Sequence, residues 1–190
     1  GTYRQLKKPG EHWEYNDVRV NALSLALMKL FRRPLPEVLD EFIMKPIGAS
    51  DSWKWHGYEN SFIEIDGKRM QSVPGGAHWG GGLFISTSDH ARVGLLVESR
   101  GRWKDRQVVS EAWIDLMIEP CPINPDYGCL WWLNKRKAFS KAASEEALFA
   151  MGVGRNVIWI DRKHQLVVVV RWLERASFQE FSRKVVSSLI

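Results

Sequence analysis

The last third of the chain constrains the fold most, because two runs of β-branched and aromatic residues lie close together there. These runs cover 156–161 and 166–172, and a short polar segment separates them. Such runs predict an antiparallel strand pair, and 148–151 is a candidate for the strand before it. A helix is expected after the pair, because apolar residues recur there at helical spacing: Phe178, Phe181, Val185 and Leu189.

Helical patterns dominate the first half of the chain. Asp17 is placed to cap a helix that runs to about Arg33, and a second helix begins near Pro36. The first helix carries an apolar stripe that we expect to be its buried face: Leu23, Ala26, Leu27, Leu30 and Phe31. The Asp66-Gly67 pair predicts the tight turn of a hairpin.

Helices and loops followed by antiparallel strands are typical of an α+β fold. We expect residues 1–145 to form a helical and loop region, and residues 146–190 to form antiparallel strands with a C-terminal helix. The chain has 190 residues, of which 45% are hydrophobic, so it can build its own core. Apolar runs such as 166–170 are far too short to span a membrane, and no membrane span is expected.

The composition argues against several classes of partner and cofactor. The net charge is +5, but lysines and arginines occur in ones and twos rather than in one basic block, so no nucleic-acid partner is expected. Cys121 and Cys129 have no histidine nearby at zinc spacing, and the five histidines show no ligand pattern. We therefore expect no metal and no cofactor. Nothing in the sequence indicates a cellular compartment.

Tyr15 is the first candidate catalytic residue. An isolated tyrosine before a helix is more often a packed aromatic, and a phenol with its usual pKa near ~10 is a poor base at neutral pH. Nearby cations that stabilise the phenolate would change this. Asp17, two residues later, is a candidate substrate-binding residue as well as the expected helix cap.

A glycine-rich segment, 75–82, surrounds His78 and Trp79. It is too rich in glycine for regular structure, and it lacks the lysine and the spacing of a phosphate-binding loop. Glycine-rich turns often serve only to bend the chain. The alternative is that His78 and Trp79 line a substrate cleft, where His78 binds substrate or tunes Tyr15. For the other nine of the ten tryptophans, core packing is the simpler interpretation.

A second glycine motif, Gly152-Val153-Gly154-Arg155-Asn156, begins the predicted strand pair. In their order along the chain, the Tyr15-Asn16-Asp17, 80–87 and 152–156 segments resemble the second half of serine β-lactamase-like hydrolases. This group includes class C β-lactamases, D-alanyl-D-alanine carboxypeptidases, related esterases and 6-aminohexanoate-oligomer hydrolases. The nucleophile motif of the group, Ser-x-x-Lys, does not occur here, because no serine has a lysine three positions on.

The resemblance implies a partial β-lactamase/transpeptidase-like fold, with the two regions together forming one incomplete domain. It implies hydrolysis of a small-molecule ester or amide through an acyl-enzyme. The serine and lysine would come from a missing N-terminal part of the same fold or from a neighbouring chain, so this chain alone would be inactive. Tyr15 would act as acid and base, and Val153 N–H on its strand would be an oxyanion donor.

The same resemblance assigns Asp17, His78, Trp79, Gly152 and Gly154 to the substrate-binding wall. Where the group has asparagine, this chain has Asp17, and no Lys-Thr pair precedes Gly152. The rival hypotheses are a noncatalytic, aromatic-rich module that binds sugars or another protein, and a degenerate member of the group. Exposed tryptophans in a flat row would favour the binding module. Convergence of the motifs on one cleft would favour the enzyme.

Overall fold

A computed structural model describes residues 7–76 and 81–189, so His78 and Trp79 lie outside the described residues. The chain divides into two compact units. Unit 1 contains the segment up to Glu14 and everything from Val93 to the C-terminal end, and unit 2 is Tyr15–Arg92. The boundary predicted near residue 145 falls within unit 1, and the assignment of both regions to one incomplete domain stays a prediction.

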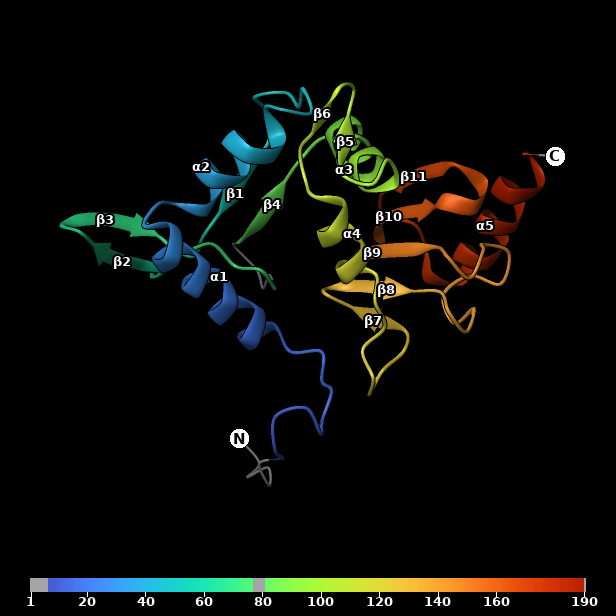
Figure 1. Cartoon of the computed structure of the whole chain (residues 1–190), viewed down its shortest axis with the longest axis horizontal. Helices are drawn as coiled ribbons and strands as arrows, with labels where there is room; N and C mark the ends of the chain where they lie inside the picture. Colours follow the sequence, from blue (N-terminus) through green and yellow to red (C-terminus); the bar gives the residue numbers. More distant parts are fainter. Residues whose placement is uncertain (1–6, 77–80, 190) are drawn as a thin grey trace. The chain divides into compact units, whose positions relative to one another are not determined.

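Unit 1 is built on a five-stranded antiparallel sheet with the order β11-β10-β9-β8-β7. The strands follow one another along the chain, so neighbours in sequence pair in space (Figure 1). Their bounds are β7 Tyr127–Gly128, β8 Trp131–Leu133, β9 Leu148–Gly152, β10 Asn156–Asp161 and β11 Leu166–Val170. The predicted pair 156–161 and 166–172 is confirmed as β10 and β11, and 148–151 as part of β9. The short strands β7 and β8 were not predicted.

Alternate residues of the central strands enter two separate cores, one on each face of the sheet. Leu148, Ile158 and Ile160 pack with Ile114 and Met117 of α4, Glu111–Met117. Phe149, Val157 and Trp159 face the other way and pack with Phe178 of α5, Phe178–Ser187. Helices therefore cover both faces of the sheet, and the predicted C-terminal helix is confirmed.

Gly94 shows how closely a helix approaches the first of these faces. It lies in α3, Thr87–Glu98, and a Cβ atom placed on it would lie 2.6 Å from Val167 Cγ1 and 3.0 Å from Ile158 Cγ2. Only glycine leaves room for this contact. The small strand pair β5, Arg102–Trp103, with β6, Arg106–Gln107, follows α3.

Most of the described tryptophans serve packing. Trp13 contacts Tyr127 and Trp132 with ring centroids 5.2 and 6.0 Å apart, and Trp159 is fully buried. Among the described tryptophans only Trp113 and Trp172 are exposed, one on α4 and one after β11. Within the described part of the chain, two such side chains do not make the flat row expected of an aromatic binding module.

Unit 2 joins two helical segments to two antiparallel strand pairs, of which one is a hairpin. Its helices are α1, Asp17–Phe31, and α2, Leu35–Leu39, which continues as a π-helical turn, Asp40–Met44. The predicted hairpin is confirmed as β2, Phe62–Ile65, and β3, Lys68–Gln71, with Asp66 and Gly67 at positive φ. The second pair joins β1, Lys54–His56, to β4, Gly82–Phe84.

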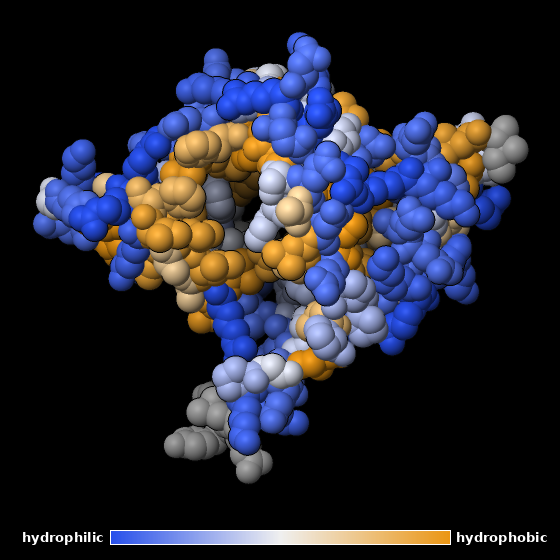
Figure 2. All heavy atoms as spheres, in the orientation of Figure 1, coloured by the Kyte–Doolittle hydropathy of each residue, from blue (hydrophilic) through white to orange (hydrophobic). Residues whose placement is uncertain are grey.

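The prediction of which face of α1 is buried was wrong. Met28 of α1 packs with Leu35, Met70 and Val73 in the core of unit 2, and Ser24 is also buried. The predicted stripe is exposed instead: Leu23, Ala26, Leu27, Leu30 and Phe31. Figure 2 shows hydrophobic surface over the region where Figure 1 draws α1 and α2. Periodicity identifies an apolar face of the helix, but it alone does not say whether that face meets the unit's own core.

No helix in the described part of the chain is long and apolar enough to cross a membrane.

Candidate functional site

The segment before α1 places Tyr15 at the start of the helix. The N-cap is Asn16, whose Oδ1 accepts a hydrogen bond from Arg19 N at 3.1 Å. The predicted cap, Asp17, is instead the first helical residue, so this prediction was wrong. Asn16 takes the role because its backbone is extended and its amide oxygen reaches the free N–H groups of the first turn. The carboxylate of Asp17 is therefore not used as the cap.

Asp17 instead contacts the glycine-rich segment. A Cβ atom placed on Gly76 would lie 2.6 Å from Asp17 Oδ1 and 2.8 Å from Asp17 Cα. At Gly75 the same atom would lie 2.5 Å from Val20 Cγ1. Backbone and helix thus touch without space for a side chain, which is the physical reason for two glycines here. Tyr15-Asn16-Asp17 and the start of the 75–82 segment are brought together within unit 2.

Asn21 fastens this segment to the helix. Its Oδ1 accepts hydrogen bonds from Gly75 N and Gly76 N, both at 3.0 Å. The sequence analysis did not identify Asn21. No local pattern marks it, because its partners Gly75 and Gly76 lie 54 and 55 positions away in the sequence.

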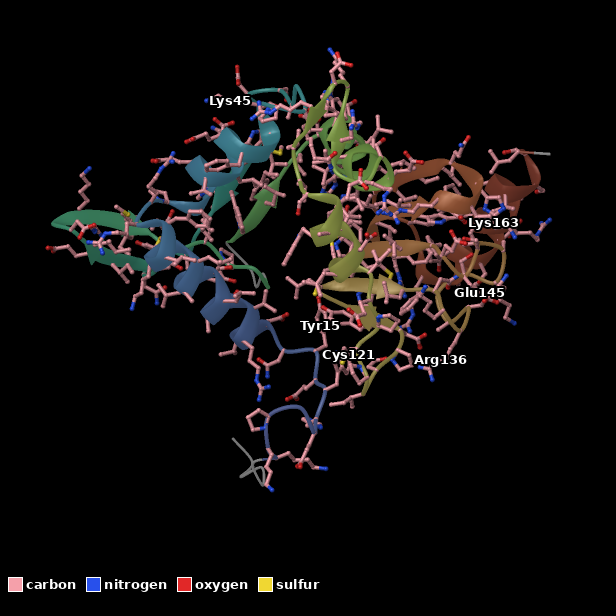
Figure 3. The ribbon with its side chains drawn as sticks, in the orientation of Figure 1. Tyr15, Lys45, Cys121, Arg136, Glu145 and Lys163 are labelled. Carbon is pink, nitrogen blue, oxygen red and sulfur yellow. The ribbon has the colours of Figure 1, made fainter. Side chains whose placement is uncertain are left out.

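Tyr15 is exposed and lies at the N-terminal end of α1, where Figure 3 labels it. The pKa of its phenol is raised above its ordinary value, first because neighbouring atoms partly remove it from water and second because the Asp17 carboxylate repels the phenolate. A base at neutral pH needs a shift in the opposite direction. Within this chain Tyr15 is therefore protonated and not activated.

The segment after the glycines is anchored by a buried carboxylate. Asp89 in the first turn of α3 accepts hydrogen bonds from Ser50 Oγ at 2.6 Å, Ser86 Oγ at 2.8 Å and Arg92 Nη1 at 2.9 Å. Ser86 Oγ also accepts a hydrogen bond from Asp89 N at 3.0 Å, which is the bond that a helix-capping serine makes. Burial opposes ionisation, but these hydrogen bonds and Arg92 together hold the pKa of Asp89 below its usual value.

The second glycine motif forms the hairpin turn between β9 and β10 in unit 1. Gly152 ends β9 and Asn156 begins β10, so Val153 lies in the turn rather than on a strand, and this part of the prediction was wrong. The reason is local: Gly154 and Arg155 have φ of 74° and 55°, which bend the chain away from extended geometry. Asn156 Nδ2 donates to Val153 O at 2.7 Å and holds the turn.

A hollow of about 530 Å³ lies beside this turn, between it and residues 172–175. A Cβ atom placed on Gly154 would lie 2.4 Å from two carbons of the Trp172 ring, so the turn rests directly on the indole. Val153 is 88% exposed at the rim, and Arg155 Nη1 lies 3.5 Å from Met151 Sδ. The turn can therefore present backbone groups to a ligand without covering them with side chains.

The structure brings some of the predicted residues together and leaves others apart. Tyr15 and Asp17 share unit 2, whereas Gly152, Val153 and Gly154 share unit 1. Their meeting in one site is part of the proposal below. Among residues 7–76 and 81–189 there is no group of three or more side chains that could hold a metal ion.

Comparison of the structure with solved structures finds relatives over nearly the whole chain. The "Putative 6-aminohexanoate-dimer hydrolase from Bacillus anthracis" matches with a TM-score of 0.64 over 97% of this chain, at 18% identity. A "putative beta-lactamase from Bacteroides dorei DSM 17855" matches with a TM-score of 0.62 over 99%, at 17% identity. The chain has a β-lactamase-like fold. The α+β class expected from the sequence is confirmed, and so is the resemblance to this group at the level of the fold.

The chain spans 44% of the first solved chain and 60% of the second. No family model and no curated protein matches its sequence. At these identities the similarity establishes the fold alone, so activity and substrates are taken up as proposals.

Proposed function

We propose that this chain is the C-terminal portion of a β-lactamase-related serine hydrolase that cleaves an ester or an amide through an acyl-enzyme. The serine and its activating lysine come from polypeptide outside these 190 residues, because no Ser-x-x-Lys occurs within them. Alone, the chain supplies parts of the site and no attacking group.

One observation carries the proposal. In a chain with this fold, Tyr15 stands at the start of α1 and its motif partner Asp17 packs against Gly76, which leads into the segment of His78 and Trp79. Asp17 and Gly76 are thus neighbours, which supports the proposal that this part of the chain forms one wall of an acyl-transfer site. Packing alone does not require this arrangement, because Tyr15 is exposed and contributes little to the core of unit 2.

The proposed chemistry gives Tyr15 the proton transfers. The lysine cation stabilises the phenolate of Tyr15, which takes the proton of the serine hydroxyl as the serine oxygen attacks the substrate carbonyl carbon. Tyr15 then returns this proton to the leaving alcohol or amine, and an acyl-serine remains. In the second half, water loses a proton to Tyr15 and attacks the acyl carbon, and the serine oxygen leaves and regains the proton.

The turn between β9 and β10 has a separate part in the proposal. Backbone N–H of Val153 and that of the nucleophilic serine stabilise the negative oxygen of the tetrahedral intermediate. Support comes from the exposure of Val153 and from the glycines on both sides, which let a substrate approach the backbone. Asp17, His78, Trp79, Gly152 and Gly154 form the substrate wall.

Labelling of the nucleophile tests the proposal. We expect a fluorophosphonate probe to leave the isolated chain unmodified and to label one serine after the polypeptide encoded directly upstream of Gly1 is restored. Mass spectrometry of the labelled peptide would locate that serine. Stoichiometric labelling of a serine within residues 1–190 of the isolated chain would refute the proposal, and so would a restored protein with no labelled serine.

A further inference from the structure

Helix α1 has one face that packs into unit 2 and one exposed apolar face that unit 2 does not use. The side chains that face the unit are Asn21, Ser24, Leu25 and Met28, which include the fully buried Met28 and the loop-binding Asn21. The other face is exposed and consists of Ala22, Leu23, Ala26, Leu27, Leu30 and Phe31. Leu30 is 75% exposed and Leu23 is 46% exposed.

The exposed face continues into a groove. Leu27 and Phe31 form one wall, Val38 and Phe42 form the other, and Trp55 contributes to the lining. The groove has a volume of about 360 Å³, and side chains of aliphatic and aromatic residues line it. Leu27 and Phe31, which form the α1 wall of the groove, belong to the apolar stripe that the sequence predicts to be buried. Aliphatic side chains at this spacing lose stabilisation when water covers them, by about 25 cal/mol for each Å² left exposed.

We propose that this surface, the exposed face of α1 together with the α1–α2 groove, is where the polypeptide that supplies the nucleophile docks through an aliphatic face of one of its own helices. This inference rests on the proposed function and adds to it the surface of contact. An amphipathic helix laid along such a groove is a common way to bury an apolar stripe.

Two observations favour this occupant. Solved chains with the same fold are longer, since this chain spans 44% and 60% of them, so a large part of the fold has no counterpart in these residues. The groove also lies along the helix that begins two residues after Tyr15. A polypeptide that delivers a lysine to Tyr15 must reach within about 3 Å of the phenol. A polypeptide that covers the exposed face of α1 is held on the helix that follows Tyr15, which is compatible with this requirement.

The test uses the intact 190-residue chain and, as the probe, the separately purified polypeptide encoded directly upstream of Gly1. We expect a 1:1 complex in titration calorimetry. Leu23→Asp combined with Leu30→Asp is expected to weaken binding by about 100-fold or more, because each change places an unpaired charge in a buried apolar contact.

Leu116→Asp is the matched control, because Leu116 is 49% exposed on helix α4, close to the 46% of Leu23. The control is expected to bind like the unchanged chain. Circular dichroism and a thermal melt of each variant establish that it is folded. If the double variant does not fold, Leu30→Asp alone replaces it, since Leu30 makes few contacts within unit 2 and is expected to weaken binding by about 10-fold.

Three results would overturn the inference. These are no binding of the upstream polypeptide, equal binding by the double variant and the unchanged chain, or a homodimer that the double variant dissolves. Fluorophosphonate labelling of the complex separates this question from the proposed function. A complex that depends on Leu23 and Leu30 but labels no serine would retain the docking surface and refute the hydrolase. Labelling of a serine that is unchanged by substitution of Leu23 and Leu30 would retain the hydrolase and refute the docking surface.

Discussion

At the scale of single residues, the proposed role of Tyr15 in proton transfer can be tested by substitution. Burial and the Asp17 carboxylate both raise its pKa. In the restored protein we expect Tyr15→Phe to lower kcat by about 100-fold or more, because the proton transfers lose their carrier. Steady-state hydrolysis of an active ester measures this, with a thermal melt to verify folding. Near-normal kcat would make Tyr15 a packed aromatic residue.

Gly154 and Trp172 form a pair whose coupling can be measured. Gly154→Ala places a methyl group 2.4 Å from ring carbons of Trp172 and also requires alanine at a φ of 74°. We expect the change to cost at least about 2 kcal/mol of unfolding free energy in the natural chain. With Trp172→Ala present, only the backbone term of about 1–2 kcal/mol should remain. Urea unfolding of the four proteins gives the coupling, and purely additive effects would show that the ring does not restrain the turn.

Neighbouring residues of similar chemistry limit what sequence can reveal at this scale. Asn16 and Asp17 are both good N-caps, and the choice between them depends on backbone angles that composition does not encode. The order Tyr15, glycine-rich segment, 152–156 motif could be recognised, because its residues stand in the order of a known group. Asn21 could not, because its role depends on Gly75 and Gly76, which lie 54 and 55 positions away.

At the scale of elements, those that depend on local sequence were predicted, and those that depend on tertiary contacts were not. The Asp66-Gly67 turn and the β10–β11 pair depend on residues close in sequence and are confirmed. Strands β7 and β8 are very short and become strands only through pairing with each other and with β9. The exposed stripe of α1 was misassigned for a related reason, since periodicity identifies an apolar face but not its partner.

The end of β10 contains a buried, hydrogen-bonded carboxylate whose contribution to stability depends on pH. Asp161 is fully buried and accepts hydrogen bonds from Ser144 Oγ at 2.6 Å and Ser144 N at 2.8 Å, and His164 Nδ1 lies 2.9 Å from it. Burial raises the pKa of Asp161, but Ser144 and His164 outweigh it and the pKa is lowered. A carboxyl whose folded pKa is depressed stabilises the fold above its unfolded pKa, near ~3.9, and this contribution is lost as the pH falls toward the folded value.

Ser144→Ala tests the hydrogen bond between Ser144 Oγ and Asp161. We expect it to cost about 1–2 kcal/mol of unfolding free energy at pH 7 and clearly less at pH 3, where Asp161 becomes protonated in the unfolded chain. Urea titrations at the two pH values measure the difference. Ser187→Ala on the exposed end of α5 serves as the control. An equal cost at both pH values would mean that the Ser144 hydroxyl does not act through the charge of Asp161.

At the scale of the whole molecule, the fold was predictable and the arrangement of its parts was not. Division of the chain at 14/15 and 92/93 brings the N-terminal segment into the same unit as the last hundred residues. Contacts such as that of Trp13 with Trp132 cause this, and they join residues far apart in sequence. No local pattern around Trp13 indicates its partner.

The proposed hydrolase activity leads to a prediction about substrate preference. Residues 146–151 contain no cation that could hold a substrate carboxylate, and Arg155, the nearest one, points a nitrogen toward Met151 Sδ. We expect the restored protein to hydrolyse short acyl esters or simple linear amides with higher kcat/KM than penicillins and cephalosporins. Spectrophotometric assays with both classes measure this. Efficient cephalosporin turnover would assign the missing charge to Arg155 or to the upstream polypeptide.

The turn at Val153 adjoins the most deeply buried strand of the molecule. From Val157 to Asp161, β10 is buried at every position and is paired on both sides, whereas Val153 is 88% exposed. Exchange of amide hydrogens should therefore slow by several orders of magnitude over a few residues, from a turn open to water to amides released only by global unfolding. Mass-spectrometric exchange over hours would show it. The backbone of Val153 is therefore held in position by the slowly exchanging strand β10 and is still exposed to molecules in solution.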